Sequence, residues 1–407
     1  MKKHLFTIAA VAFALCACQK AETGITEVTP GVNEKVGAPQ QILIGTNLKS
    51  SELVTKASVD EWTDQTVYVI GYDNDKIGTA TEVSTDAGFI MPNVKGTVSP
   101  VNPTAPETKA LKGSLTFSDK FYYDEDVQSY DFVGYYLGDD ITTSADDVTV
   151  NGGLLTLDFG IDGSQDVLAG ITDIENDRKF TDDQGALKLV KKEYVYSAFA
   201  ARREVQPTLL FNHMLTKFSF TVKYGSEGGD ETTKFYLDSL TLGTHTSGTL
   251  SLNPAARAIP YVTKTGDEDI VTLATPDVSF TEKDEDGKSA GDLMVLPNEE
   301  SYLMTLYYHQ DGTDGLSHDY AIPIEIGNVQ WTDSQEHPEI TEFQPGKCYN
   351  VEVTVYGLEK IEVNVELVEW DEVGSVVIDP DDPDGNGRAA HAEGTGTVAK
   401  GTSSHAE

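Results

Sequence analysis

Short runs of alternating apolar and polar residues follow one another along most of this chain. Residues 217–224 carry four apolar side chains at every second position, and residues 361–367 repeat the pattern. A side-chain period of two places the apolar members on one face, as in a half-buried β-strand. Clusters of glycine, aspartate, asparagine and serine separate the runs, and no long amphipathic helical pattern interrupts them. The pattern predicts an all-β fold of sandwiches or barrels.

The N-terminus has the pattern of a bacterial secretory signal peptide. Two lysines precede a mostly apolar run over residues 5–15, which is about half the length needed to span a bilayer and is therefore interpreted as a signal core. Ala17 directly before Cys18 resembles a lipoprotein cleavage box, in which the cysteine after the cut is acylated. We expect removal of residues 1–17 and a lipid, such as palmitate, on Cys18. The alternative is an ordinary signal peptide with a chance cysteine.

Charge and cysteine content exclude some functions. The formal net charge is −38, and a surface this acidic repels phosphate backbones, so we expect no nucleic-acid partner. Once the signal is removed and Cys18 is acylated, Cys348 is the remaining cysteine of the three. An intrachain disulfide is then excluded, and stability must come from packing.

The chain is too long for one ordinary domain. We predict a tether and a removable first strand in residues 18–56, one β-sandwich in residues 57–204 and a second in residues 205–378. The boundary is placed after the charged, weakly patterned residues 191–204. Residues 379–407 are acidic and poor in apolar side chains, and we expect them to be a disordered tail.

The sequence lacks the common catalytic patterns. It has no Gly-x-Ser-x-Gly elbow, no His-Glu-x-x-His, no phosphate-binding Gly-Lys-Ser/Thr loop and no Cys-x-x-Cys pair. His213 lies in a strand-like apolar run and is interpreted as a structural histidine. Abundant carboxylates would suit a glycosidase pair, but nothing in the sequence selects two of them. We expect no enzyme activity and no cofactor.

One stretch of the tail fits a calcium-loop pattern. Asp382, Asp384, Asn386 and Glu393 fall at the spacing of oxygen ligands in such a loop. No helical pattern flanks them, and the surrounding residues are mainly glycine, alanine and serine. A solvated tail is therefore the preferred interpretation, with these four residues as weak candidate metal ligands.

Four segments together resemble one known family. They are Val54–Ala57 followed by Trp62, Asp166–Ala169, Leu210–Phe218, and Phe343–Tyr349 followed by a predicted hairpin that ends at Trp370. The fourth is the most specific in order and spacing. With the lipoprotein signal, these segments make about residues 1–378 similar to the fimbrillins, the type V pilus subunits of Bacteroidota.

The resemblance implies a fold and a route of assembly. Fimbrillins are exported as lipoproteins and fold as two transthyretin-like β-sandwiches. In stalk subunits a trypsin-like protease cuts a loop near the N-terminus, often after arginine, and releases the lipidated segment with its first strand. Loss of that strand opens a groove, and a strand from a neighbouring subunit then fills it.

Two strands are assigned on this basis. Residues 40–47 are the candidate for the displaced strand, with Ile42 and Ile44 on one side. The candidate donor strand is residues 361–367, whose apolar positions are Ile361, Val363, Val365 and Leu367. The alternative interpretation of the donor is an ordinary final strand of the second sandwich.

The processing site carries lysine instead of arginine. Lys56 stands where the family often has arginine, so a cut there would leave Ala57 as the new N-terminus. The first arginine of the chain is Arg178. Either a protease that accepts lysine cuts at Lys56, or the chain stays uncut and lipid-bearing, as would suit an anchor subunit. The alternative is that Lys56 is an ordinary exposed loop residue.

The expected function is a structural subunit of a cell-surface fimbrium. Its expected partners are other fimbrial subunits, the processing protease, the outer membrane through the lipid before cleavage, and a host or bacterial surface ligand. The first alternative is an uncleaved anchor subunit. The second is a monomeric surface lipoprotein that binds a glycan or host ligand. Trp331, in a loop-like context, is the tryptophan available as a sugar platform.

Overall fold

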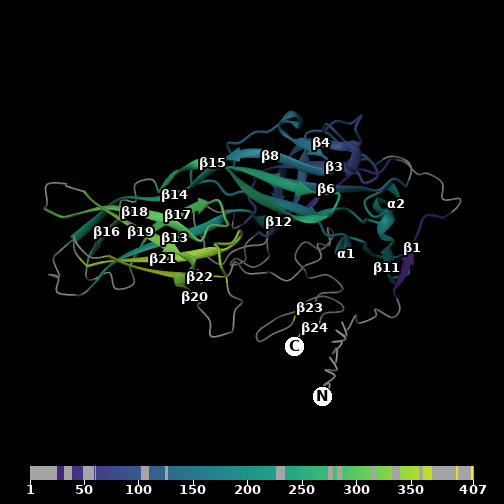
Figure 1. The fold of residues 1–407 in the computed structure, drawn as a ribbon. Helices are drawn as coiled ribbons and strands as arrows, with labels where there is room; N and C mark the ends of the chain where they lie inside the picture. Colours follow the sequence, from purple (N-terminus) through teal and green to yellow (C-terminus); the bar gives the residue numbers. More distant parts are fainter. Residues whose placement is uncertain are drawn as a thin grey trace, which may run out of the picture.

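The computed structural model describes residues 25–31, 39–48, 59, 61–101, 110–123, 127–225, 234–273, 278–281, 287–312, 317–331, 340–356 and 361–368, together with β23 (His391–Ala392) and β24 (His405–Ala406). The predicted predominance of β-structure is confirmed. Most strands up to residue 213 (purple to teal) and the strands that follow (mainly green) form two groups that lie side by side in Figure 1, while the strands of residues 149–160 pair with the second group.

The N-terminal group is a closed barrel with the strand order β12-β2-β5-β4-β3-β6-β9. Its strands are β2 (Gly45–Leu48), β3 (Thr66–Asp73), β4 (Phe89–Pro100), β5 (Lys112–Phe117), β6 (Tyr130–Tyr136), β9 (Leu168–Thr172) and β12 (Thr208–His213). β2 is antiparallel to β5 and parallel to β12, so it closes the barrel between them.

A small sheet accompanies the barrel. It consists of β1 (Thr26–Val28), β11 (Leu187–Val190) and β10 (Lys179–Thr181), in that order. β1 is parallel to β11, and β10 is antiparallel to it. The earliest described strand of the chain is thereby bound to a hairpin more than a hundred residues later in the sequence.

Two further sheets form the C-terminal group. The order of the first is β17 (Lys288–Val295), β13 (Thr216–Tyr224), β21 (Cys348–Val355), β22 (Ile361–Val368) and β20 (Val329–Trp331). The order of the second is β19 (His318–Glu325), β18 (Ser301–Gln310), β14 (Lys234–Asn253), β8 (Leu154–Gly160) and β7 (Thr149–Asn151), and β15 (Ala258–Leu273) and β16 (Val278–Thr281) also pair with β14. Trp331, expected in a loop, ends a strand.

The long strand β14 joins the two halves of the chain. Its first part pairs with β18, and its residues 247–252 pair with β8. At the tip of the β14–β15 hairpin, Arg257 donates from Nε to Asp131 Oδ2 on β6 at 2.8 Å. The predicted boundary at residue 204 stays a prediction, and β12, which follows it, pairs with barrel strands β2 and β9.

The helices of the described ranges are short. They are α1 (Ile174–Asp177), α2 (Ala198–Ala201), η1 (Ile77–Thr79), η2 (Ala145–Asp147), η3 (Lys192–Tyr194) and η4 (Ile326–Asn328). The side chains of Asp173 and Ser197 accept hydrogen bonds from the first turns of α1 and α2, as N-caps do. Within the described parts of the chain, no helix has the length and apolar character needed to cross a membrane.

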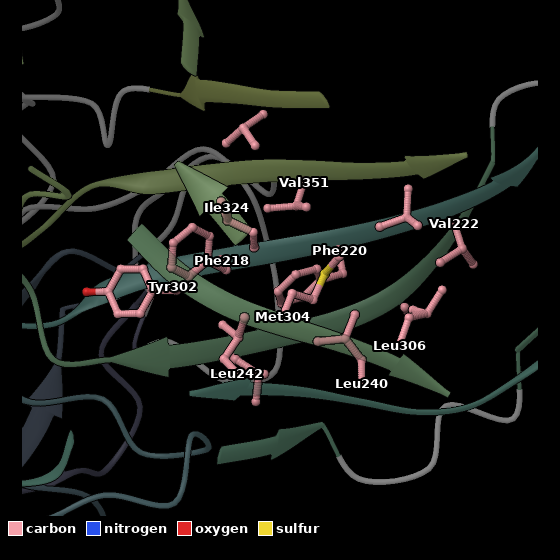
Figure 2. Close-up of a cluster of buried hydrophobic side chains, with 14 of the residues drawn as sticks. Phe218, Phe220, Val222, Leu240, Leu242, Tyr302, Met304, Leu306, Ile324 and Val351 are labelled. Atoms are coloured by element: carbon pink, nitrogen blue, oxygen red, sulfur yellow. The ribbon is translucent and has the colours of Figure 1, made fainter. Parts of the chain in front are cut away.

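Apolar side chains gather in three clusters. One fills the space between the two C-terminal sheets, where Phe218, Tyr302 and Met304 meet (Figure 2). A second fills the barrel and includes Trp62 and Phe211. The third lies where the barrel meets β8 and β14. Alternate residues of each strand supply these cores, as the period-two pattern predicts.

Candidate functional site

The segment that contains β2 is held on both sides by backbone hydrogen bonds. Toward β12, the amide of Gly45 donates to the carbonyl of Pro207 at 3.0 Å, ahead of the parallel ladder. On the β5 side the bonds are Ile42 N to Phe121 O, Tyr123 N to Gln40 O, Leu115 N to Ile44 O, and Leu48 N to Leu111 O, at 2.8–2.9 Å. Loss of this segment would leave unpaired backbone groups on two neighbouring strands.

The same segment contributes to the barrel core. Ile42 is 2% exposed and Ile44 is 1% exposed, and Leu48 is buried with them. Leu43 points the other way and is 54% exposed. Each fully buried aliphatic side chain stabilises the fold by about 1.5–3 kcal/mol. The displaced strand is expected over residues 40–47, but β2 begins only at Gly45, so Ile42 and Ile44 lie in the segment just ahead of it. Their side chains nevertheless lie in the core as expected, and displacement of the segment would open an apolar groove.

Gln206 adds a side-chain clamp to this segment. Its Oε1 accepts from the amide of Leu43 at 3.2 Å, and its Nε2 donates to the carbonyl of Gln41 at 3.2 Å. One amide side chain thus satisfies a donor and an acceptor of a segment more than a hundred residues earlier in the sequence. Sequence reasoning missed this residue, because a glutamine beside a predicted domain boundary carries no signal of its partners.

A partly buried carboxylate supports β12 where it meets β2. Asp177 Oδ2 accepts from the amide of Thr208 at 2.8 Å and from the Tyr196 hydroxyl at 2.6 Å. Thr208 is the residue of β12 that lies opposite Gly45. Burial raises the pKa of the Asp177 carboxyl to about 7, against the lowering effect of its hydrogen bonds.

The chain just after the expected cut is fixed by a buried His–Asp pair. The amide of Val59 donates to Asp166 Oδ2 at 2.9 Å, and His213 Nδ1 lies 2.8 Å from the same oxygen. Both side chains are almost fully buried. This contact agrees with the interpretation of His213 as a structural residue. Lys56 and Ala57 themselves lie outside the described residues, as does Cys18.

Trp62 anchors the same stretch a few residues later. Its ring packs edge-on against Phe211 at 5.3 Å between centroids, and its amide donates to the carbonyl of Ala110 at 2.8 Å. Residues from the first three family-like segments, including Trp62, Asp166 and His213, thus contribute to the contacts of the chain just after the expected cut. The described chain just after the expected cut is thus bound to the barrel through Val59 and Trp62.

The candidate donor strand is an internal strand of its sheet. β22 is antiparallel to β21 and parallel to β20. Ile361, Val365 and Leu367 are buried, and Val363 is half-buried against the same core. The pattern agrees with a resident strand, and the donor role stays a prediction.

The candidate calcium ligands Asp382, Asp384, Asn386 and Glu393 lie outside the described residues. Within the described ranges, no three histidine, cysteine or acidic side chains gather in a way that could hold a metal ion.

Comparisons with known proteins give one family match. The sequence model of a family described as fimbrillin-like matches residues 55–370. No curated protein matches the chain.

Solved structures similar to this chain include three from Bacteroides and Parabacteroides. A candidate cell adhesion protein from Bacteroides uniformis is 17% identical, with a TM-score of 0.45, over 82% of this chain and 98% of its own. A fimbrial protein from Bacteroides vulgatus is 12% identical, with a TM-score of 0.42, over 82% of this chain and 100% of its own. A fimbrial assembly protein from Parabacteroides distasonis is 12% identical, with a TM-score of 0.40, over 82% of this chain and 97% of its own.

Proposed function

Because the chain belongs to the fimbrillin-like family, we propose that it is a structural, non-enzymatic subunit of a cell-surface fimbrium that assembles by strand exchange. The observation that carries the proposal is the position of β2. It closes the barrel between β5 and β12, yet it lies upstream of a junction that is fixed independently at Val59. One cut between these two points disconnects a core strand from the rest of the fold.

Removal of the strand would create the binding site for the next subunit. The groove would present the open edges of β5 and β12 and the apolar surface that Ile42 and Ile44 now cover. An incoming strand restores both the backbone hydrogen bonds and the buried area, which is the donor-strand mode of recognition. Proteolysis thereby controls assembly, because the groove stays filled in the uncut chain.

The donor we propose is β22 of the neighbouring subunit. Its buried residues Ile361, Val365 and Leu367 lie on one face of the strand, and Ile42 and Ile44 likewise lie on one face of the segment to be replaced. Before donation, β22 must separate from β21 and β20. Exchange therefore breaks its pairing in its own subunit and replaces it with pairing in the groove of the neighbouring subunit. The prediction of two transthyretin-like sandwiches stays a prediction, beside the closed barrel of the N-terminal strands and the two sheets of the C-terminal group.

Export and processing complete the proposal. We propose that Cys18 is acylated, that the chain reaches the outer surface as a lipoprotein, and that a trypsin-like protease able to accept lysine cuts after Lys56. An uncut chain is the second candidate. It is favoured by Lys56 itself, since an arginine-specific protease finds no target before Arg178. Such a chain would keep its lipid and serve as an anchor subunit.

Substitution of the donor strand tests the assembly step. Val363→Asp with Val365→Asp places charges on the apolar face of β22 and is expected to abolish polymerisation of cut subunits. The matched control is Asn364→Asp, which adds a charge at an exposed position of the same strand. Normal fibres from the double variant would remove β22 as the donor.

Because buried charges can also unfold the resident domain, a second readout is needed. A synthetic peptide of residues 361–368 is titrated onto cut wild-type subunits. Wild-type peptide should bind and block polymerisation, and the peptide with both aspartates should do neither.

A further inference from the structure

The segment upstream of β2 contains a second strand that is bound to the folded domain. β1 pairs in parallel with β11, with Thr26 opposite Lys188 and Val28 opposite Val190. The amide of Lys191 donates to the carbonyl of Val28 at 3.0 Å. This stretch falls within the polar segment expected to include a tether, so its pairing could not be read from a periodic pattern.

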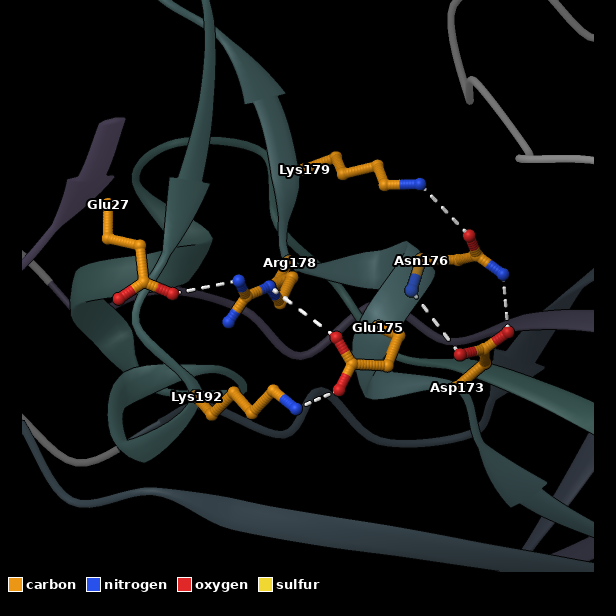
Figure 3. Close-up of polar contacts among 7 residues, drawn as sticks. All are labelled: Glu27, Asp173, Glu175, Asn176, Arg178, Lys179 and Lys192. Atoms are coloured by element: carbon orange, nitrogen blue, oxygen red, sulfur yellow. Dashed lines mark hydrogen bonds and ion pairs between the residues drawn. The ribbon is translucent and has the colours of Figure 1, made fainter. Parts of the chain in front are cut away.

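A partly buried ion pair reinforces this contact. Arg178 Nη2 donates to Glu27 Oε1 at 2.8 Å, and the Arg178 side chain is 10% exposed. Figure 3 shows Arg178 between Glu27 and Glu175, where Glu175 also contacts Lys192. Glu175 lies farther from the guanidinium than Glu27 does, at 3.8 Å. Glu27 therefore supplies the short, charge-assisted bond to this arginine, and such bonds are stronger than neutral ones.

Apolar contact adds to the pairing. Val28 is partly buried and packs against the barrel core, as do Phe180 of β10 and Ile174 of α1. β1 is thus attached by backbone pairing with β11, by the ion pair of Glu27 with Arg178, and by the apolar contact of Val28. The segment upstream of residue 56 is consequently held at two separate places, at β11 through β1 and inside the barrel through β2.

We propose that the edge of β11, with Arg178, is a second docking site for the N-terminal propeptide, so that a cut chain keeps its propeptide bound until β1 also detaches. The proposal rests on the proposed function for the existence of the cut, but the docking site does not depend on polymerisation. The partner that fits the site is an extended segment with a carboxylate at its centre. Its consequence is that cutting and opening of the groove are separate steps.

The test uses the otherwise full chain with an engineered protease site in place of Val54–Ala57. After complete cutting, release of the N-terminal fragment is followed by size exclusion and mass spectrometry in a series of mild urea concentrations. Because the cut is engineered, the assay measures the release rate of the fragment even if the native protein is never cut and forms no fibre. Failure of the proposed function and failure of the docking site are therefore distinguished.

Two variants each remove a different interaction of the docking site, the ion pair in one and a backbone hydrogen bond in the other. Glu27→Ala removes the ion pair and should speed release about tenfold, which corresponds to about 1.4 kcal/mol. Its control is Glu268→Ala, which removes the same charge from an exposed position on β15. Lys191→Pro removes the amide that donates to Val28, and the φ of −63° and ψ of 135° at this residue suit proline.

The control for Lys191→Pro is Lys191→Ala, which loses the side chain and keeps the amide. We expect faster release from Glu27→Ala and Lys191→Pro than from their controls, with unchanged melting of the fragment-free domain. Release of the wild-type fragment as fast as the chain is cut would overturn the proposal. Equal release rates for both variants and their controls would overturn it as well.

Discussion

The substitution Ile44→Ala should lower the thermal stability of the uncut precursor and leave that of the assembled fibre unchanged. Ile44 is 1% exposed inside the barrel core, on the segment that we propose is lost on processing. Truncation of a buried isoleucine to alanine destabilises a fold by about 2–5 kcal/mol, through lost burial and the cavity that remains. A loss of about 3 kcal/mol lowers the melting temperature by about 6–12 °C in a domain of this size.

The matched control is Leu43→Ala, the neighbouring residue in the same segment just ahead of β2. Leu43 is 54% exposed, and its backbone amide keeps its bond to Gln206 in the variant. A substitution at such a surface position changes the free energy of unfolding by about 0.5 kcal/mol or less. The two precursors should therefore differ clearly in thermal unfolding followed by circular dichroism.

Fibres assembled from these chains should not differ at all. If residues up to 56 are removed, the mature Ile44→Ala subunit has the same sequence as the wild type, so the fibres should melt together. Equal melting of the two variant precursors would refute the assigned core position of Ile44. Fibres that melt lower when they carry Ile44→Ala would show that the strand is still present and would refute its removal.

Two further predictions concern buried charges. Burial raises the pKa of Asp177 to about 7 from 3.8, so its stabilisation is present at low pH and lost as pH rises through 7. Relative to Asp177→Asn, the wild type should lose of the order of 4 kcal/mol between pH 4 and pH 8 in urea titrations, and a pH-independent difference would contradict this. Arg257→Ala should destabilise the protein by about 1–3 kcal/mol, because it leaves the buried carboxylate of Asp131 without its cation. Since Arg257 holds down an Asp131 pKa that burial raises, the loss should be larger at pH 8 than at pH 5, and equal losses would count against the pair.

The sequence predicted strands well wherever one face is buried. Residues 361–367 alternate in the sequence and form β22, and Ile42 and Ile44 face the core as expected. The physical reason is that a strand with one wet face shows its period locally. β1 shows the limit of this reasoning, because three residues at the edge of a small sheet carry too few side chains to display a period.

Pairing between distant segments was beyond the sequence. β14 continues for 20 residues and pairs with β8 and β18 in different parts of its length, which no local pattern reveals. Individual polar contacts were hidden for a similar reason. Asp177 is one of 67 acidic residues in the chain, and its burial depends on a tertiary contact with Tyr196. Asp166 and His213 could be singled out from family-like segments, but their meeting at Val59 could not.

The most direct test of the account is the N-terminus of the protein in fibres taken from the native cell surface, by intact mass and N-terminal peptide mapping. We predict that the subunits begin at Ala57, without lipid and without the segment that contains Ile42, Ile44 and β2. Material that begins entirely at an acylated Cys18 would contradict proteolysis-triggered assembly. The chain would then be a tethered anchor or a monomeric binding lipoprotein.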